Sequence, residues 1–204
     1  MNDTAENTTR SPAGAYRPTL NYYHPNARGT GCAVRFELHP AHDNVGGSIF
    51  ATLARQRSVG GMNGGQRVFP SFDWTNRICV KLDMSDLSQM LQVFRGMLES
   101  VGDGKGLFHS SESASTIIRL EHRIEPVPGY LFDVRKKTNS DDVSSCGLVF
   151  SPTEALGLSL AIEQSMGYIA FGIPKVMPRE RPLAAPTPSA EPLAATGTEG
   201  PLPF

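Results

Sequence analysis

Two stretches of the chain, VKLDMSDLSQMLQVF (residues 80–94) and LVFSPTEALGLSLAI (148–162), align on one another without gaps. In each stretch a short apolar strand runs into a helix, and a capping residue stands at the junction, Asp83 in the first and Ser151 in the second. Asp86 and Glu154 follow three residues later, at the spacing of a capping box. Unrelated strand-to-helix junctions can share this chemistry, so the match alone leaves a duplication open.

The order of elements before each junction also repeats. In the first half, alternating apolar residues and then a helical spacing predict strands over 32–40, 47–56 and 77–83 and a helix over 84–101. In the second half the same patterns predict strands over 115–124, 129–137 and 146–151 and a helix over 151–171. The glycine-rich segment 57–67 is interpreted as a mobile loop. We therefore predict an internally duplicated α+β fold, with two antiparallel sheets and two packed helices.

The composition divides the chain into one folded body and two tails. Residues 1–20 have no hydrophobic periodicity and are predicted to form a disordered arm. Residues 21–173 are predicted to form a single duplicated domain, with halves at about 30–103 and 104–173. Residues 174–204 hold eight of the sixteen prolines, and this Pro/Ala-rich segment is predicted to be a disordered tail.

The composition and the cysteine count indicate the class of protein and its compartment. With 39 % hydrophobic and 19 % charged residues, the chain has the composition of a globular protein, and no membrane span is expected. The N-terminal residues lack an apolar signal core, and the three cysteines are odd in number and far apart in sequence. We expect reduced thiols and a cytoplasmic location.

Charge is unevenly distributed, although the formal net charge is −1. Residues 32–82 hold six basic side chains against three acidic ones, whereas 83–103 hold one against four. If the two apolar helix stripes pack together, the open side of the strands carries the basic residues, which include Arg35, Arg77, Lys81, Arg119, Arg123 and Arg135. Such a sheet, with aromatic rings added, is a surface for single-stranded nucleic acid.

This order of elements, over about 30–173, resembles the Whirly and positive-cofactor-like single-stranded-DNA-binding fold. The resemblance implies a largely sequence-independent single-stranded-DNA-binding protein with roles in replication, recombination or repair. The candidate nucleic-acid-binding residues are Arg35, Arg55, Arg57, Phe72, Trp74, Arg77, Lys81, Arg119, Arg123, Tyr130, Arg135, Lys136 and Lys137. Trp74 could instead be a core residue. The basic cluster 134–137 could instead be a solvated hairpin end.

Other functions are weighed against this one. The chain has no phosphate-binding loop, dinucleotide fingerprint or nucleophile motif, so we expect no enzyme, no catalytic residues and no cofactor. His39 and His42 lack paired cysteine partners, and we expect no metal site. A protein-interaction module and an RNA-binding protein of the same fold stay as alternatives.

The final residues suggest a partner. Leu202, Pro203 and Phe204 resemble the C-terminal tip with which bacterial single-stranded-DNA-binding proteins capture replication and repair proteins. Only Glu191 and Glu199 supply acid in the last 24 residues, so a tip without function is the alternative. We also expect a homo-oligomer, because exposed sheet edges and helix faces need cover.

Overall fold

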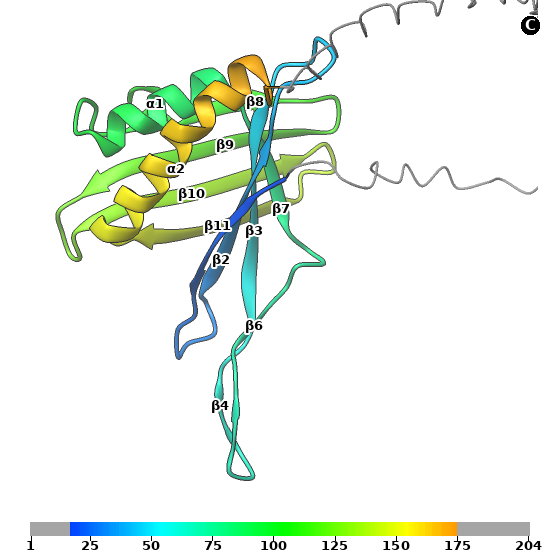
Figure 1. Ribbon diagram of the computed structural model, residues 1–204. Helices are drawn as coiled ribbons and strands as arrows, with labels where there is room; N and C mark the ends of the chain where they lie inside the picture. Colours follow the sequence, from blue (N-terminus) through cyan, green and yellow to red (C-terminus); the bar gives the residue numbers. More distant parts are fainter. Residues whose placement is uncertain (1–16, 175–204) are drawn as a thin grey trace, which may run out of the picture. The chain divides into compact units, whose positions relative to one another are not determined.

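The two halves of the chain form two antiparallel sheets (Figure 1), in a computed structural model that describes residues 17–174. The first sheet consists of β1 (Thr19–His24), β2 (Cys32–His39) and β3 (Ser48–Ser58), with β6 (Ser71–Phe72) and β7 (Ile78–Leu82) both paired to β3. The second consists of β8 (Leu107–Ser110), β9 (Ala114–Arg123), β10 (Gly129–Thr138) and β11 (Val143–Phe150). The helices are α1 (Met84–Phe94) and α2 (Pro152–Phe171).

Each half is therefore an antiparallel meander of four main strands followed by one helix, and the short β6 is a fifth strand of the first sheet. Both helices begin with the expected capping box: Asp83 with Asp86 before α1, and Ser151 with Glu154 before α2. These hydrogen bonds satisfy backbone N–H groups that would otherwise lack partners in the first helical turn. The expected α+β fold with two antiparallel sheets and two packed helices is confirmed.

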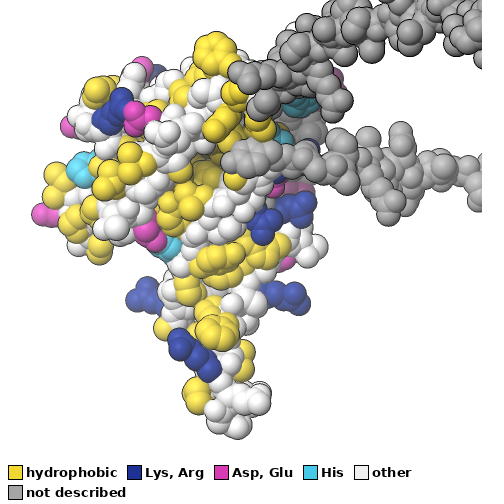
Figure 2. Space-filling view, viewed as in Figure 1, with side chains coloured by type: hydrophobic (Ala, Val, Ile, Leu, Met, Phe, Trp, Pro, Cys, Tyr) yellow, Lys and Arg dark blue, Asp and Glu magenta, His cyan; other side chains and the backbone are white. Residues whose placement is uncertain are grey.

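The segment 57–67 differs from the expected loop. It contains a two-stranded ribbon, β4 (Gly61–Asn63) paired with β5 (Gln66–Val68), and β3 itself continues to Ser58. Gly64 and Gly65, both with positive φ, form the two-residue turn that joins the strands. We call residues 58–71 the arm, which projects from the body with basic and apolar side chains together on its surface (Figure 2).

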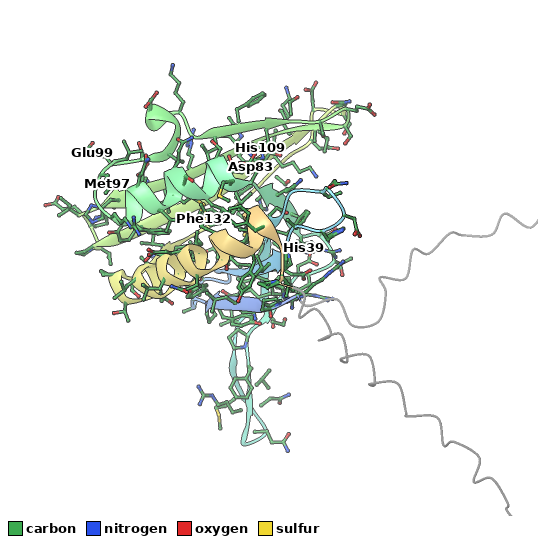
Figure 3. The ribbon with its side chains drawn as sticks, turned by 45° about the horizontal axis from the view of Figure 1, so that its top comes forward. His39, Asp83, Met97, Glu99, His109 and Phe132 are labelled. Atoms are coloured by element: carbon green, nitrogen blue, oxygen red, sulfur yellow. The ribbon has the colours of Figure 1, made fainter. Side chains whose placement is uncertain are left out.

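Both sheets and both helices share one core. Phe132 on β10 is fully buried, and its ring lies 5.8 Å from Phe36 on β2 and 6.1 Å from Phe150 on β11 (Figure 3). From the helices, Leu87 and Leu158 are buried in the same cluster. The two helix stripes thus meet as expected, and the opposite faces of the sheets are left open. Neither helix in the described part of the chain has the length and apolar character of a membrane span.

Helix α1 is shorter than the predicted 84–101. Gly96 adopts a positive φ of 69°, Met97 N–H donates to the carbonyl of Gln92, and Gly96 N–H donates to that of Val93. These two bonds form a Schellman motif, which ends the helix at Phe94. Val101 is buried nonetheless, at the start of a 3-10 turn (Val101–Gly104).

The first strand of each half was not predicted. β1 begins at Thr19, two residues before the expected start of the folded domain, and β8 covers only four residues. Each is an edge strand of its sheet, and edge strands need less apolar patterning than central ones.

Candidate nucleic-acid interface

The outer face of the first sheet combines aromatic rings with cations. Strand alternation places Arg35 next to Thr52 and Cys79 across β2, β3 and β7, and Phe50 next to Lys81. We define the Trp74 face by six residues on this side of the sheet: Tyr23, Arg35, Phe50, Trp74, Arg77 and Lys81. They come from β1, β2, β3, β7 and the loop between β6 and β7, and the folded sheet brings them together.

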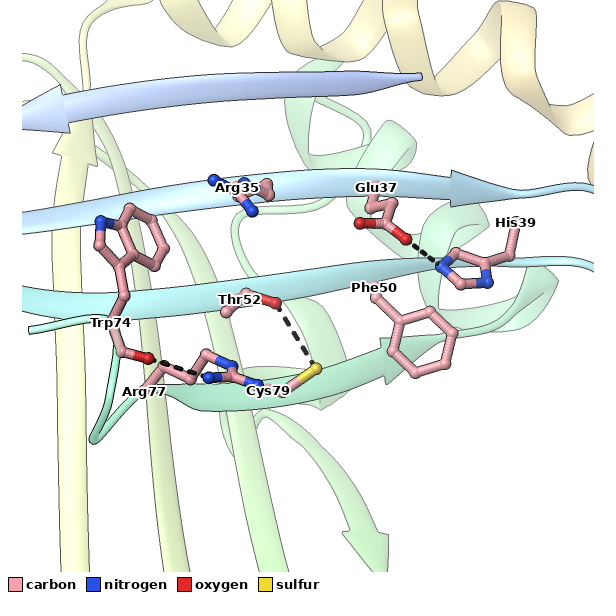
Figure 4. A pocket seen from close by; sticks show the side chains of 8 residues that line it. All are labelled: Arg35, Glu37, His39, Phe50, Thr52, Trp74, Arg77 and Cys79. Carbon is pink, nitrogen blue, oxygen red and sulfur yellow. Dashed lines mark hydrogen bonds and ion pairs between the residues drawn. The ribbon is translucent and has the colours of Figure 1, made fainter. Parts of the chain in front are cut away.

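Trp74 is the centre of this face. It is half-buried and lies outside the core cluster, so the core interpretation of this residue is wrong. The Arg35 guanidinium stacks over the indole, 5.1 Å from the ring centroid, and its Nε donates to Asn21 Oδ1 at 3.1 Å. Arg77 Nη1 donates to the Trp74 carbonyl at 3.0 Å (Figure 4). Two guanidinium groups are thus held beside one half-buried indole.

A tight turn orients Trp74. The Asp73 carboxylate accepts hydrogen bonds from the backbone N–H groups of Thr75 and Asn76 and from the Asn76 side chain. The Asn76 side chain and backbone are the main reasons that the pKa of Asp73 is lowered. Because this carboxylate is engaged by the turn, it adds rigidity beside the indole.

Two hollows meet at Trp74. The first, of about 490 Å³, has a mixed polar and apolar lining and is lined by Arg35, Glu37, His39, Phe50, Thr52, Trp74, Arg77 and Cys79 (Figure 4). The second, of about 470 Å³, is aromatic and is lined by Tyr23, Pro25, Phe69, Pro70, Ser71, Phe72 and Trp74. The Tyr23 and Phe72 rings lie 5.6 Å apart in it. A ligand with charged groups and flat apolar rings fits this pair of hollows.

The cations of the Trp74 face are available for an anion. Among residues 17–174, none of Arg35, Arg77 and Lys81 lies within ion-pair distance of a carboxylate. Glu37, the acid in the first hollow, is already engaged: its Oε1 lies 2.7 Å from His39 Nε2 and 3.7 Å from Arg17 Nη1. The face therefore carries unneutralised positive charge.

The arm and its two flanking residues add further arginines and aromatic rings beside the Trp74 face. Residues 57–72 contain Arg57 and Arg67 and no acidic residue. The Arg67 guanidinium lies over the Phe69 ring at 5.2 Å, and Phe69 is 69 % exposed. A second arginine–aromatic pair thus stands beside the aromatic hollow.

The outer face of the second sheet is different, because two of its four cations form ion pairs and the carboxyl group of Asp133 lies near the other two. Arg123 pairs with Glu121, Lys137 pairs with Asp141, and Asp133 stands opposite Arg119 on the neighbouring strand. Burial raises the pKa of Asp133, and Arg119 and Arg135 oppose that effect. This sheet does bring its expected arginines to one face, but with their charge largely balanced.

Three expected site residues lie away from both outer faces. Tyr130 lies on the helix-covered side of β10, where its ring packs against Phe94 at 5.3 Å. Lys136 shares that side, since it is an even number of residues from Phe132. Arg55 lies on the core side of β3, and its Nε donates to the Ser145 carbonyl at 2.8 Å. Neighbouring residues of a strand face opposite sides of the sheet, so a basic or aromatic residue in a strand need not lie on the outer face.

Phe50 was not among the expected site residues. Phe50 stands between the buried residues Ile49 and Ala51. The alternation of the strand therefore indicates that the Phe50 ring lies on the outer face of the sheet. Tyr23 belongs to β1, which was not predicted as a strand. Within residues 17–174, no three His, Cys, Asp or Glu side chains form a group that could hold a metal ion.

Two crossed antiparallel sheets, each followed by a helix, define a Whirly-like α+β fold. The chain is similar to the crystal structures of WHY1 and WHY3 from Arabidopsis thaliana, at 14 % identity and TM-scores of 0.59 and 0.57. The matches cover 76 % and 78 % of this chain and 86 % and 90 % of those chains. The plant transcriptional regulator PBF-2 matches at 14 % identity and a TM-score of 0.57, over 76 % of this chain and 82 % of that one. No family model and no curated protein matches the sequence.

Proposed function

We propose that this chain binds single-stranded DNA, largely independently of sequence, on the Trp74 face, and that it acts as a binding protein and not as an enzyme. The observation that carries the proposal is Trp74 with the Arg35 guanidinium stacked on it and Arg77 beside it. Cations bind phosphates, and flat rings stack on bases of any identity. The resemblance to the Whirly fold points to the same ligand.

A single strand fits this site better than a duplex. The aromatic hollow beside Trp74 needs a flat ring from the ligand, and only an unpaired base offers its face freely. Arg35 and Arg77 line the adjoining hollow, to which Trp74 also contributes. A base in the aromatic hollow and its phosphate near Arg35 and Arg77 use both halves of the site.

The path of the strand continues along the arm. Phe72 lines the aromatic hollow, and Phe69 and Arg67 stand at its rim on the arm. Arg57, at the base of the arm, adds a cation near Asp73, and its charge helps to lower the pKa of that carboxyl group. The second-sheet residues Arg119, Arg123, Arg135 and Lys137 are proposed to contribute less, because acids offset their charge. Arg55, Tyr130 and Lys136 are left out of the path.

The test is a titration of the full chain into fluorescent oligo-dT, oligo-U and a duplex at several salt concentrations. We expect preference for single strands over the duplex, with affinity falling steeply as salt rises. Tighter binding to oligo-U than to oligo-dT would favour the RNA alternative. Absence of binding to all three at low salt would refute a nucleic-acid function and leave the protein-interaction alternative.

Self-association is part of the proposal. Leu156, Leu160 and Phe171 of α2 are 61 %, 52 % and 90 % exposed, and they recur on one side of the helix. A second copy would cover these apolar side chains. The same surface is where a protein partner, the alternative function, would bind.

The C-terminal tip, Leu202, Pro203 and Phe204, lies outside the described residues and stays a proposal. We propose that it docks proteins of replication, recombination or repair, in a cytoplasmic setting. Deletion of residues 199–204 should leave oligo-dT affinity unchanged and abolish capture of such partners. Capture that persists after the deletion would remove the tip from the proposal.

A further inference from the structure

Two of the three cysteines meet at the junction of the two sheets. Cys32 begins β2 and Cys146 lies in β11, and both side chains face the shared core, where they line the same hollow. Both are buried, with 2 % and 6 % of their surface exposed. Neither is in a disulfide, and the third cysteine, Cys79, is exposed on the first sheet's outer face.

The pair is reachable by a small molecule. Both cysteines line a hollow of about 390 Å³, together with Arg55, Gln56, Asp133 and Gly147 among other residues. Cys146 and Arg55 also line a second hollow of about 200 Å³. A water-sized reagent can therefore approach Cys146 although little of its surface is open.

Arg55 supplies positive charge at this junction. Its Nε donates to the carbonyl of Ser145, the neighbour of Cys146, at 2.8 Å, which holds the guanidinium in place. The hydrogen bond from Cys32 lowers the pKa of Cys146; burial opposes this effect, and the charge of Arg55 adds to it. The same hydrogen bond and burial raise the pKa of Cys32. Cys146 is thus the better nucleophile and Cys32 the resolving thiol.

We propose that Cys32 and Cys146 form an oxidation site for small hydroperoxides, at which a disulfide closes between the two sheets. The Cys146 thiolate attacks one peroxide oxygen and breaks the O–O bond, giving a sulfenic acid and hydroxide, which takes up the proton that Cys146 lost. The Cys32 thiol then attacks the sulfenic sulfur, forming the S–S bond, and its proton leaves with the hydroxyl group as water. Two electrons pass from the sulfurs to the peroxide.

The cross-link has a structural consequence. It joins the second strand of the first half to the last strand of the second half, and the closed loop spans residues 32–146. A bond across so long a loop restricts the unfolded chain and stabilises the folded one. The inference is independent of the proposed nucleic-acid function.

The test uses the full chain with Cys79→Ser, so that the buried pair is intact and the exposed thiol is absent. Hydrogen peroxide should lower the intact mass by about 2 Da, for the two hydrogens removed. Peptide mapping should then show Cys32 linked to Cys146, and the melting temperature should rise by about 5–10 °C. A dithiol reductant should reverse all three changes.

The control is a second substitution in the Cys79→Ser variant. In Cys79→Ser with Cys146→Ser, the mass decrease and the rise in melting temperature should both disappear. The proposal is overturned if, after peroxide treatment of Cys79→Ser and unfolding, both remaining thiols still react with iodoacetamide. It is overturned equally if Cys146 gains oxygen without forming a bond to Cys32.

Discussion

Nε2 of His24 lies 2.9 Å from Oε1 of Glu154, so the first strand of one half holds the helix start of the other. The second oxygen of Glu154 accepts the Ser151 N–H and closes the capping box. The other half repeats this arrangement: Asp86 closes the capping box before α1, and His109 on β8 lies 3.1 Å from it, near Asp83 (Figure 3). The duplication thus extends to an exchanged histidine–carboxylate pair.

The Glu154 hydrogen bonds predict an acid-sensitive part of the stability. Burial by itself raises the pKa of Glu154, but hydrogen bonds from Ser151 and His24 outweigh it, and the pKa is lowered. A lowered pKa in the folded state means that the stabilisation is complete above the unfolded value, about 4.3, and disappears as pH falls through the folded value.

We therefore expect Glu154→Gln to lower the free energy of unfolding by about 1 kcal/mol at neutral pH. The difference from wild type should shrink as pH falls below about 4. Urea denaturation at a series of pH values measures it. The matched control is Glu163→Gln, which changes another glutamate of α2 and removes its exposed ion pair with Arg95. Its effect on the free energy of unfolding should depend much less on pH. A constant difference for Glu154→Gln down to pH 3 would contradict the assignment.

Trp74→Ala should weaken oligo-dT binding by about 1–3 kcal/mol, roughly 5- to 150-fold, because one base no longer has a ring to stack on. The matched control is Phe108→Ala, since Phe108 is 65 % exposed on the outer side of the second sheet. That variant should bind like wild type. Fluorescence anisotropy at one salt concentration compares the three proteins, and equal weakening in both variants would contradict the assigned face.

Removing two cations of the Trp74 face should change the salt dependence. For Arg77→Ala with Lys81→Ala, the slope of log affinity against log salt should fall in magnitude by about 1.4, because each phosphate that is no longer neutralised on a single strand reduces it by about 0.7. Arg119→Ala with Arg135→Ala removes the same charge from the second sheet, where acids already offset it. An equal change of slope in both double variants would show that the two sheets contribute alike.

Leu160→Asp should reduce the molar mass of the protein in solution, because a charge in the apolar surface of α2 opposes its burial against a second copy. Size-exclusion chromatography with light scattering measures the mass. Gln92→Asp places the same charge at an exposed position on α1 and should leave the mass unchanged. Should wild type itself be a monomer across the concentrations used, self-association through α2 is wrong.

Local patterns were sufficient for most of the fold. Alternation predicted β2 and β7, since Val34, Phe36, Val80 and Leu82 are all buried. The capping boxes located the starts of both helices because caps are short-range hydrogen bonds within four residues. The end of α1 was missed, although Gly96 was visible, because apolar spacing continued past it to Val101, which a 3-10 turn buries instead.

The candidate site was predictable only in its composition. The sequence by itself indicated arginines and rings on open sheet faces, and a duplicated α+β fold to carry them. Only the tertiary structure decided that Arg35 stacks on Trp74, that the second sheet's cations face acids, and that Arg55 and Tyr130 point elsewhere. It also placed Cys32 and Cys146 in the lining of one hollow. Such pairings join residues far apart in the chain, and they depend on strand register and sheet crossing, which no local pattern encodes.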